Sequence, residues 1–150
     1  MFFSIFDIMF EYKHLEEESK GDFAFEVYAD TLEELFIGAG LATMSAMVKL
    51  ESLRIEKEYV FTLESQDLVL LMYDFLSELI YIKDVETLLF KEFELKIEKK
   101  EHFLLHCTAK GALIDWEKNE LYTDVKAATM HEMEIKQKEN KWYFHAILDL

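Results

Sequence analysis

Two aspartates lie at the ends of expected strands, where their carboxylates could help to hold a metal ion. Asp22 follows Gly21 at the start of one strand. Asp149 ends the apolar strand WYFHAIL, beside the terminal carboxylate of Leu150. Strand ends that meet at one edge of a sheet gather oxygens, and calcium takes roughly six to eight oxygen ligands. Acidic residues are so numerous in this chain that spacing alone favours two solvated strand ends over a metal site.

No motif in the sequence points to catalysis. There is no Gly-rich phosphate loop, no serine in a Gly-flanked turn and no Cys/His pattern with zinc spacing. The five histidines are spread over different expected elements. His131 falls on the core side of an expected strand, where a hydrogen-bonded structural histidine is favoured over a ligand or acid–base group by about two to one. We therefore assign no catalytic residue.

The charge of the chain restricts its partners. Its 31 acidic and 16 basic residues give a formal net charge of −15. Such a surface repels phosphate backbones and anionic membranes, and the longest basic cluster, residues 96–100, contains Glu98. A basic protein or a metal cation is the natural complement, and we expect no direct nucleic-acid or membrane contact.

The length of 150 residues suits a single domain, which we expect to span residues 9–150. Residues 1–8 are apolar but lack the basic start and cleavage site of a secretory signal, so we interpret them as an N-terminal extension. No apolar run approaches the ~20 residues of a membrane span. Cys107 is the single cysteine. A cytoplasmic protein without disulfides fits these features.

A strand followed by a capped helix forms the best-defined unit of the first half. Residues 23–28 alternate between apolar and polar or small side chains, which is typical of a strand with one buried face. Thr31 and Glu34 have the spacing of a capping box, with the Glu34 carboxylate reaching back to the Thr31 N–H. A helix should run from Thr31 to about Val48. A short first strand at residues 10–14 is expected before this unit.

The rest of the chain alternates one further helix with strands. A strand is expected over residues 53–63, and Ser65 is the expected cap of a helix with Asp67 in its first turn. That helix carries an apolar stripe from Leu68 to Ile80. Period-two alternation predicts strands at residues 93–97, 103–109, 125–135 and 142–148, and Trp116 falls in a hydrophilic connection. The prediction is an α+β fold with two amphipathic helices on a mostly antiparallel β-sheet.

Four separate segments resemble, in order, the hallmark segments of the archease family. These are GDFAFEVYADTLEELF with the small-residue helix after it, DLVLLMYDFLSELIYIKDVETLLFKEF, VKAATMHEMEI and the closing ILDL. The likeness extends from about Tyr12 to Leu150. It implies an archease-like fold and a chaperone-like, non-enzymatic activator of the RtcB-type RNA ligase in tRNA splicing and RNA repair. Members of the family promote transfer of GMP from GTP to the ligase histidine and allow repeated turnover.

The resemblance also implies a metal site, usually described with calcium. The family's acidic ligands fall on Asp22 and Asp149, with Leu150 contributing backbone or terminal oxygens. Lys126 and His131 match the family's Lys-Ala-x-Thr-x-His strand, and we treat them as motif positions without a catalytic role. One departure concerns the segment before Asp22, which reads Ser19-Lys20-Gly21 where the family has His-Thr-Ala. It affects metal binding more than the fold, because neighbouring groups hold ligands in position.

Two other functions compete with this one. A chaperone-like modulator of a tRNA methyltransferase, to which the family has also been linked, would keep the protein interface and lose the guanylylation effect. A metal-dependent hydrolase using Asp22 and Asp149 would need a general base beside them, and His131 lies on another expected strand. The hydrolase is the weaker of the two.

Overall fold

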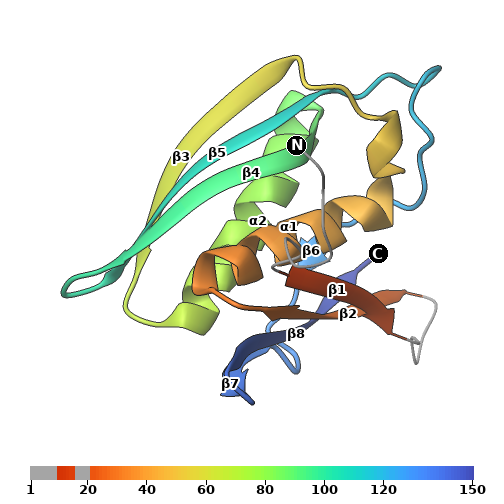
Figure 1. The fold of residues 1–150 in the computed structure, drawn as a ribbon. Helices are drawn as coiled ribbons and strands as arrows, with labels where there is room; N and C mark the ends of the chain where they lie inside the picture. Colours follow the sequence, from red (N-terminus) through yellow and green to blue (C-terminus); the bar gives the residue numbers. More distant parts are fainter. Residues whose placement is uncertain (1–9, 16–20) are drawn as a thin grey trace, which may run out of the picture.

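The computed structural model describes residues 10–15 and 21–150, and Figure 1 shows its ribbon. The predicted extension at residues 1–8 and most of the loop before Asp22 lie outside the described residues. The elements in chain order are β1 (Phe10–Leu15), β2 (Asp22–Ala29), α1 (Leu32–Met47), the 3₁₀ turn η2 (Leu50–Ser52), β3 (Lys57–Ser65), α2 (Leu68–Glu86), β4 (Leu88–Lys99), β5 (Phe103–Leu113), β6 (Ala127–Ala128), β7 (Glu134–Lys138) and β8 (Lys141–Asp149).

Two antiparallel sheets enclose the helices. One sheet has the order β1-β2-β8-β6, with β7 also paired to β8, and the other has the order β3-β5-β4. Both helices lie between the sheets, α1 in contact with β2 and β4, and α2 in contact with β3 and β6 (Figure 1). The predicted α+β class is confirmed, and the strands divide into two sheets because each helix has apolar residues to cover on more than one side.

Helix α1 owes its position to small residues on two of its faces. A Cβ atom at Gly38 would lie 2.6 Å from Val27 Cγ1 in β2, and one at Gly40 would lie 2.9 Å from Phe93 Cε2 in β4. Glycine therefore permits α1 to approach both sheets closely. Thr31 caps the helix as predicted, accepting from the Glu34 N–H at 3.2 Å. The Glu34 carboxylate accepts from the Thr31 hydroxyl at 2.6 Å instead of from the Thr31 N–H.

The N-cap of helix α2 lies two residues later than predicted. The cap is Asp67, whose carboxylate accepts from the Leu70 N–H at 3.2 Å. Ser65 is the last residue of β3, and its hydroxyl accepts from the Asp67 N–H at 3.3 Å, so the prediction of a Ser65 cap is wrong. The strand before it starts at Lys57 instead of Leu53, because residues 50–52 form the 3₁₀ turn. Within the described residues, neither helix is long and apolar enough to span a bilayer.

The expected long strand at residues 125–135 is wrong. The structure has the two-residue strand β6, a turn closed by the Met133 N–H to Met130 O bond at 3.2 Å, and then β7. Glu132 adopts a positive φ of 54° in this turn, which ends the alternation. His131 is consequently 76% exposed, and its predicted place on the core side is also wrong.

Candidate functional site

The register of the larger sheet places the two predicted metal ligands opposite each other. Asp22 at the start of β2 is the cross-strand partner of Asp149 at the end of β8. Directly opposed residues of antiparallel strands project to the same face with Cβ atoms roughly 4.5–5.5 Å apart. Leu148, the neighbour of Asp149, is fully buried against the helices, so the two aspartates lie on the outer, solvent-facing side of the sheet.

Backbone hydrogen bonds fix the end of the chain beside this pair. The Leu150 N–H donates to Gly21 O at 2.8 Å, and the Lys126 N–H donates to Asp149 O at 2.8 Å. The last two residues are thus held from both neighbouring strands. We call Asp22, Asp149 and Leu150 the acidic rim.

The acidic rim has the chemistry of an oxygen-ligand site. Like charges directly opposite each other in a sheet repel, and a divalent cation between them would relieve that repulsion. In the part of the chain that the structure describes, no group of three or more His, Cys, Asp or Glu side chains is placed to hold a metal. Further ligands would be backbone oxygens, such as those of Leu150, and water, a mixture that calcium accepts. The metal site stays a prediction.

The two motif positions lie apart from each other. Lys126 is exposed just before β6 and lines a shallow hollow of about 210 Å³ together with Tyr81 and Asp84 of α2. His131 lies in the turn beyond β6, where Nε2 is 3.4 Å from a Glu132 carboxylate oxygen. The neighbouring Glu132 carbonyl accepts from His145 Nδ1 at 2.8 Å. His145 is four residues from Asp149 along β8, which corresponds to roughly 13 Å. The structure therefore does not bring His131 to the acidic rim.

A second site, which sequence reasoning missed, surrounds the buried lysine of α2. Lys83 is only 6% exposed, and its ammonium lies 2.5 Å from Asp124 Oδ1 and 2.7 Å from Asp84 Oδ1. It also donates to Val125 O at 2.7 Å. The available signal was its position, four residues after Leu79 in the apolar stripe of the helix.

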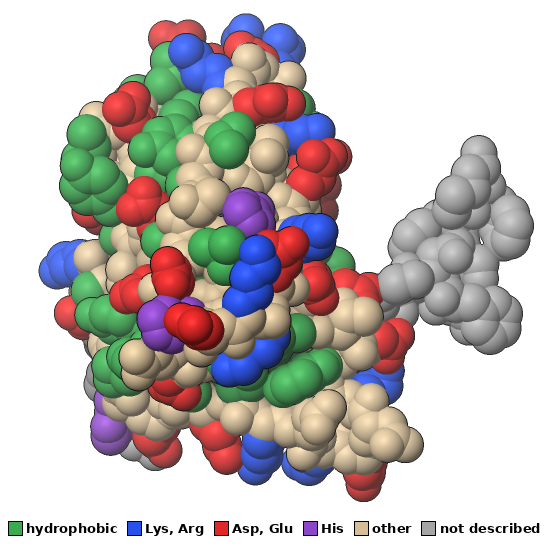
Figure 2. Space-filling view, turned by 90° about the vertical axis from the view of Figure 1, so that its left-hand side faces the viewer, with side chains coloured by type: hydrophobic (Ala, Val, Ile, Leu, Met, Phe, Trp, Pro, Cys, Tyr) green, Lys and Arg blue, Asp and Glu red, His purple; other side chains and the backbone are tan. Residues whose placement is uncertain are grey.

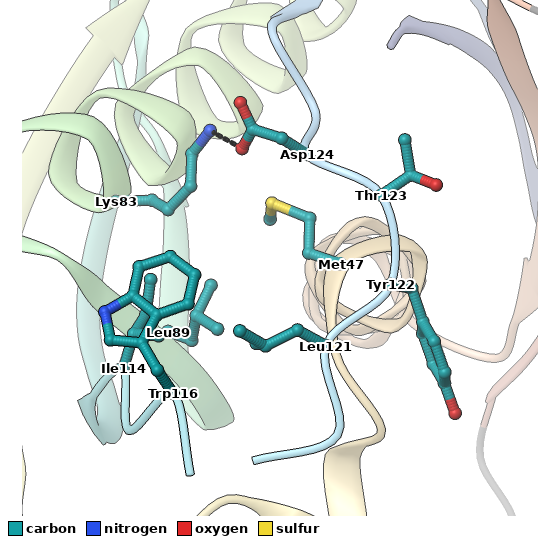
Figure 3. Close-up of a pocket in the computed structure, with 9 residues that line it drawn as sticks. All are labelled: Met47, Lys83, Leu89, Ile114, Trp116, Leu121, Tyr122, Thr123 and Asp124. Carbon is teal, nitrogen blue, oxygen red and sulfur yellow. Dashed lines mark hydrogen bonds and ion pairs between the residues drawn. The ribbon is translucent and has the colours of Figure 1, made fainter.

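Lys83 lies at one end of a pocket of about 370 Å³, drawn in Figure 3. We call this the Trp116 pocket, and its lining residues are Met47, Lys83, Leu89, Ile114, Trp116, Leu121, Tyr122, Thr123 and Asp124. In Figure 3 the Trp116 ring lies beside Leu89 and Ile114, whereas the Tyr122 ring points away from the centre. The pocket combines apolar walls with an ion pair.

Comparisons with known proteins agree with this architecture. Residues 12–150 match the Archease protein family (MTH1598/TM1083). A protein archease of Pyrococcus furiosus is 35% identical over 144 residues, covering 95% of this chain and 100% of its own length.

Two solved structures have the same fold. The solution structure of protein 1598 of Methanobacterium thermoautotrophicum superposes with a TM-score of 0.79 at 36% identity, covering 94% of this chain and 98% of that protein. An archease of Thermotoga maritima superposes with a TM-score of 0.61 at 16% identity, covering 92% and 99% of the two chains. On the family match and these identities together, the chain belongs to the archease family.

Proposed function

We propose that this protein is a non-catalytic activator of an RtcB-type RNA ligase, which promotes guanylylation of the ligase and its repeated turnover. The observation that carries the proposal is the pairing of Asp22 with Asp149 across β2 and β8. In a member of the archease family, this pairing gathers the expected acidic ligands at one edge of the domain.

The acidic rim would act by positioning charge near the nucleotide site of the ligase. Asp22, Asp149 and the oxygens of Leu150 would hold a calcium ion, which supplies positive charge for phosphate oxygens when bound. The hydrogen bonds from Leu150 to Gly21 and from Lys126 to Asp149 keep these oxygens in place before the partner arrives. A preorganised group of this kind orients a bound nucleotide without entering the reaction.

Other features of the chain favour an accessory role over catalysis. Burial raises the pKa of the only thiol, Cys107, to about 12, so this sulfur is a poor nucleophile at neutral pH. Burial and the hydrogen bond to Glu26 also raise the pKa of Tyr143. On the face shown in Figure 2, acidic and basic side chains alternate in small groups, and the basic ones form no continuous patch for a phosphate backbone.

The test measures ligase–GMP formation with radiolabelled GTP and the number of RNA joining turnovers. The wild-type protein should raise both quantities, and Asp149→Asn should lose most of the gain because it removes one rim carboxylate. Asp74→Asn is the matched control, since Asp74 is an exposed aspartate of α2 away from the rim.

Two results would contradict the proposal. The first is a ligase whose GMP loading and turnover do not respond to the wild-type protein. The second is full activation by Asp149→Asn, which would remove the rim from the mechanism. Stimulation of a tRNA methyltransferase with no effect on the ligase would replace the proposal with the chaperone-like alternative.

A further inference from the structure

The Trp116 pocket is built on a loop that is fixed in place although it contains no regular secondary structure. The Asp115 carboxylate accepts from the N–H groups of Glu117 and Lys118 at 3.0 and 3.1 Å. The Asn119 side chain accepts from Asp115 N at 2.7 Å and donates to Ser52 O at 2.8 Å. These bonds close a turn around Trp116 and tie it to the 3₁₀ turn η2.

The next residues of the loop are attached to the end of α1. The Tyr122 N–H donates to Met47 O at 2.7 Å, and the Thr123 N–H donates to Ala46 O at 3.3 Å. Two carbonyls of the last helical turn, which would otherwise lack partners, are thereby satisfied. The loop on both sides of the pocket is therefore preorganised.

Trp116 projects from this fixed loop with 76% of its surface exposed. A large aromatic ring on a preorganised backbone gains binding energy when a partner covers it, and tryptophan is among the residues that dominate binding energy at protein interfaces. Beside the ring, the apolar side chains of Leu89, Ile114 and Leu121 form the walls of the pocket (Figure 3). The combination suits an inserted apolar or cationic side chain.

The charges around the pocket select a basic occupant. The ammonium of Lys83 has three hydrogens and already contacts three oxygens, those of Asp84, Asp124 and Val125, so it has no donor left for an anion. The Asp124 side chain lines the pocket, is still 65% exposed and can accept further bonds. The segment 115–124 carries four acidic residues against one lysine. Phosphate and nucleic acid are disfavoured, and a lysine or arginine is favoured.

The backbone connects the pocket to the acidic rim over a short distance. Asp124 closes the pocket, and two residues later the Lys126 N–H bonds to Asp149 O at 2.8 Å. The segment that lines the pocket is therefore also bonded to the strand that carries Asp149.

We propose that the Trp116 pocket is the docking site for a basic segment of the protein partner, with Trp116 as the anchor and Asp124 as the acceptor for its cationic side chain. The identity of that partner as the RNA ligase rests on the proposed function. Docking here would hold the acidic rim at the partner's nucleotide site.

The experiment measures the affinity of the RNA ligase for the full chain by biolayer interferometry. Trp116→Ala should weaken binding at least 10-fold, because it removes the anchor, and it should preserve the fold because the ring is exposed. Val60→Ala is the matched control, since Val60 is an apolar residue of β3 that is 69% exposed and does not line the pocket, and it should change affinity less than 3-fold. Glu117→Gln should lower the association rate about 2-fold at low salt.

A fluorescence measurement tests the contact directly. In the Trp142→Phe variant, Trp116 is the only tryptophan of the chain. Its emission should shift to shorter wavelength, and its quenching by acrylamide should fall, when the ligase is added. An unshifted emission during normal binding would place the interface elsewhere.

Three results would overturn the inference, and they are distinguishable. Normal ligase binding by Trp116→Ala would exclude the pocket alone and leave the activator function standing. Absence of binding by the wild type would remove the activator function together with this partner. Dimerisation of the wild type alone, abolished by Trp116→Ala in analytical ultracentrifugation, would make a second copy of the chain the occupant.

Discussion

The Trp116 pocket and the acidic rim both bring together carboxylates from distant parts of the chain, but in opposite settings. At the end of the pocket, the buried ammonium of Lys83 is neutralised by Asp124, which lines the pocket, and by Asp84 outside it. At the rim, Asp22 and Asp149 face each other across two strands on the solvent-facing side of the sheet. The first arrangement stabilises the fold, whereas the second places like charges together, as a cation site requires. The setting of a carboxylate thus indicates its role better than its presence does.

The largest loss of stability from a single substitution should come from Lys83. Lys83→Met keeps a long apolar side chain but leaves the carbonyl of the buried Val125 without its partner. Asp84 and Asp124 are more than half exposed and can be hydrated again, so the loss should fall below that of a fully buried pair. We expect the free energy of unfolding in urea to fall by about 2 kcal/mol.

A surface lysine provides the control for that measurement. Lys96 is 71% exposed, and its Nζ lies 3.3 Å from Oε1 of Glu98 in the same strand, β4. Lys96→Met should change the free energy of unfolding by no more than about 0.5 kcal/mol. Equal losses of unfolding free energy in Lys83→Met and Lys96→Met would mean that the buried ion pair stabilises the fold no more than an exposed one.

The rim should respond to calcium where the pocket does not. A ligand at 100 times its dissociation constant stabilises the folded state by about 2.7 kcal/mol. For a chain of this size each kcal/mol corresponds to roughly 2–4 °C, so saturating calcium should raise the melting temperature by roughly 5–10 °C. Asp149→Asn should abolish this rise, and Trp116→Ala should retain it. A calcium-dependent rise that survives in Asp149→Asn would exclude the proposed ligand set.

A smaller effect is expected when Lys83 loses one of its two carboxylate partners. Asp124→Asn keeps an oxygen that can accept from Lys83, and Asp84 still supplies a negative charge. Because Asp124 is 65% exposed, much of its interaction is screened by water. The free energy of unfolding should fall by about 0.5–1 kcal/mol. A loss as large as that of Lys83→Met would show that Asp84 contributes little to neutralising the lysine.

Local patterns in the sequence predicted those parts of the fold that depend on near neighbours. The alternation in β2, the Thr31 cap and the apolar stripe of α2 are each determined within a few residues, and the structure has all three. The positions of Asp22 and Asp149 at strand ends also followed from local pattern. Their direct pairing did not, because it depends on how β2 and β8 align across more than a hundred residues.

Long-range contacts explain what the sequence did not predict. The loop that carries Trp116 is held by Ser52 and by the end of α1, and no local signal describes those bonds. The turn after β6 has no glycine or proline, although Glu132 takes a positive φ of 54° there. Without that signal, the alternating residues on either side of the turn resemble one continuous strand.

The smallest effect is expected at His131, which belongs to neither of the two regions compared above. Its side chain is 76% exposed in the turn after β6, and Nε2 lies 3.4 Å from a carboxylate oxygen of the adjacent Glu132. Exposed substitutions away from caps and buried networks change stability within about 0.5 kcal/mol, so His131→Ala should leave the urea midpoint unchanged within that limit. The calcium-dependent rise in melting temperature should also be preserved, because His131 lies away from the acidic rim. A loss above about 2 kcal/mol would instead fit a core histidine on a continuous strand, because only a buried side chain costs that much to remove.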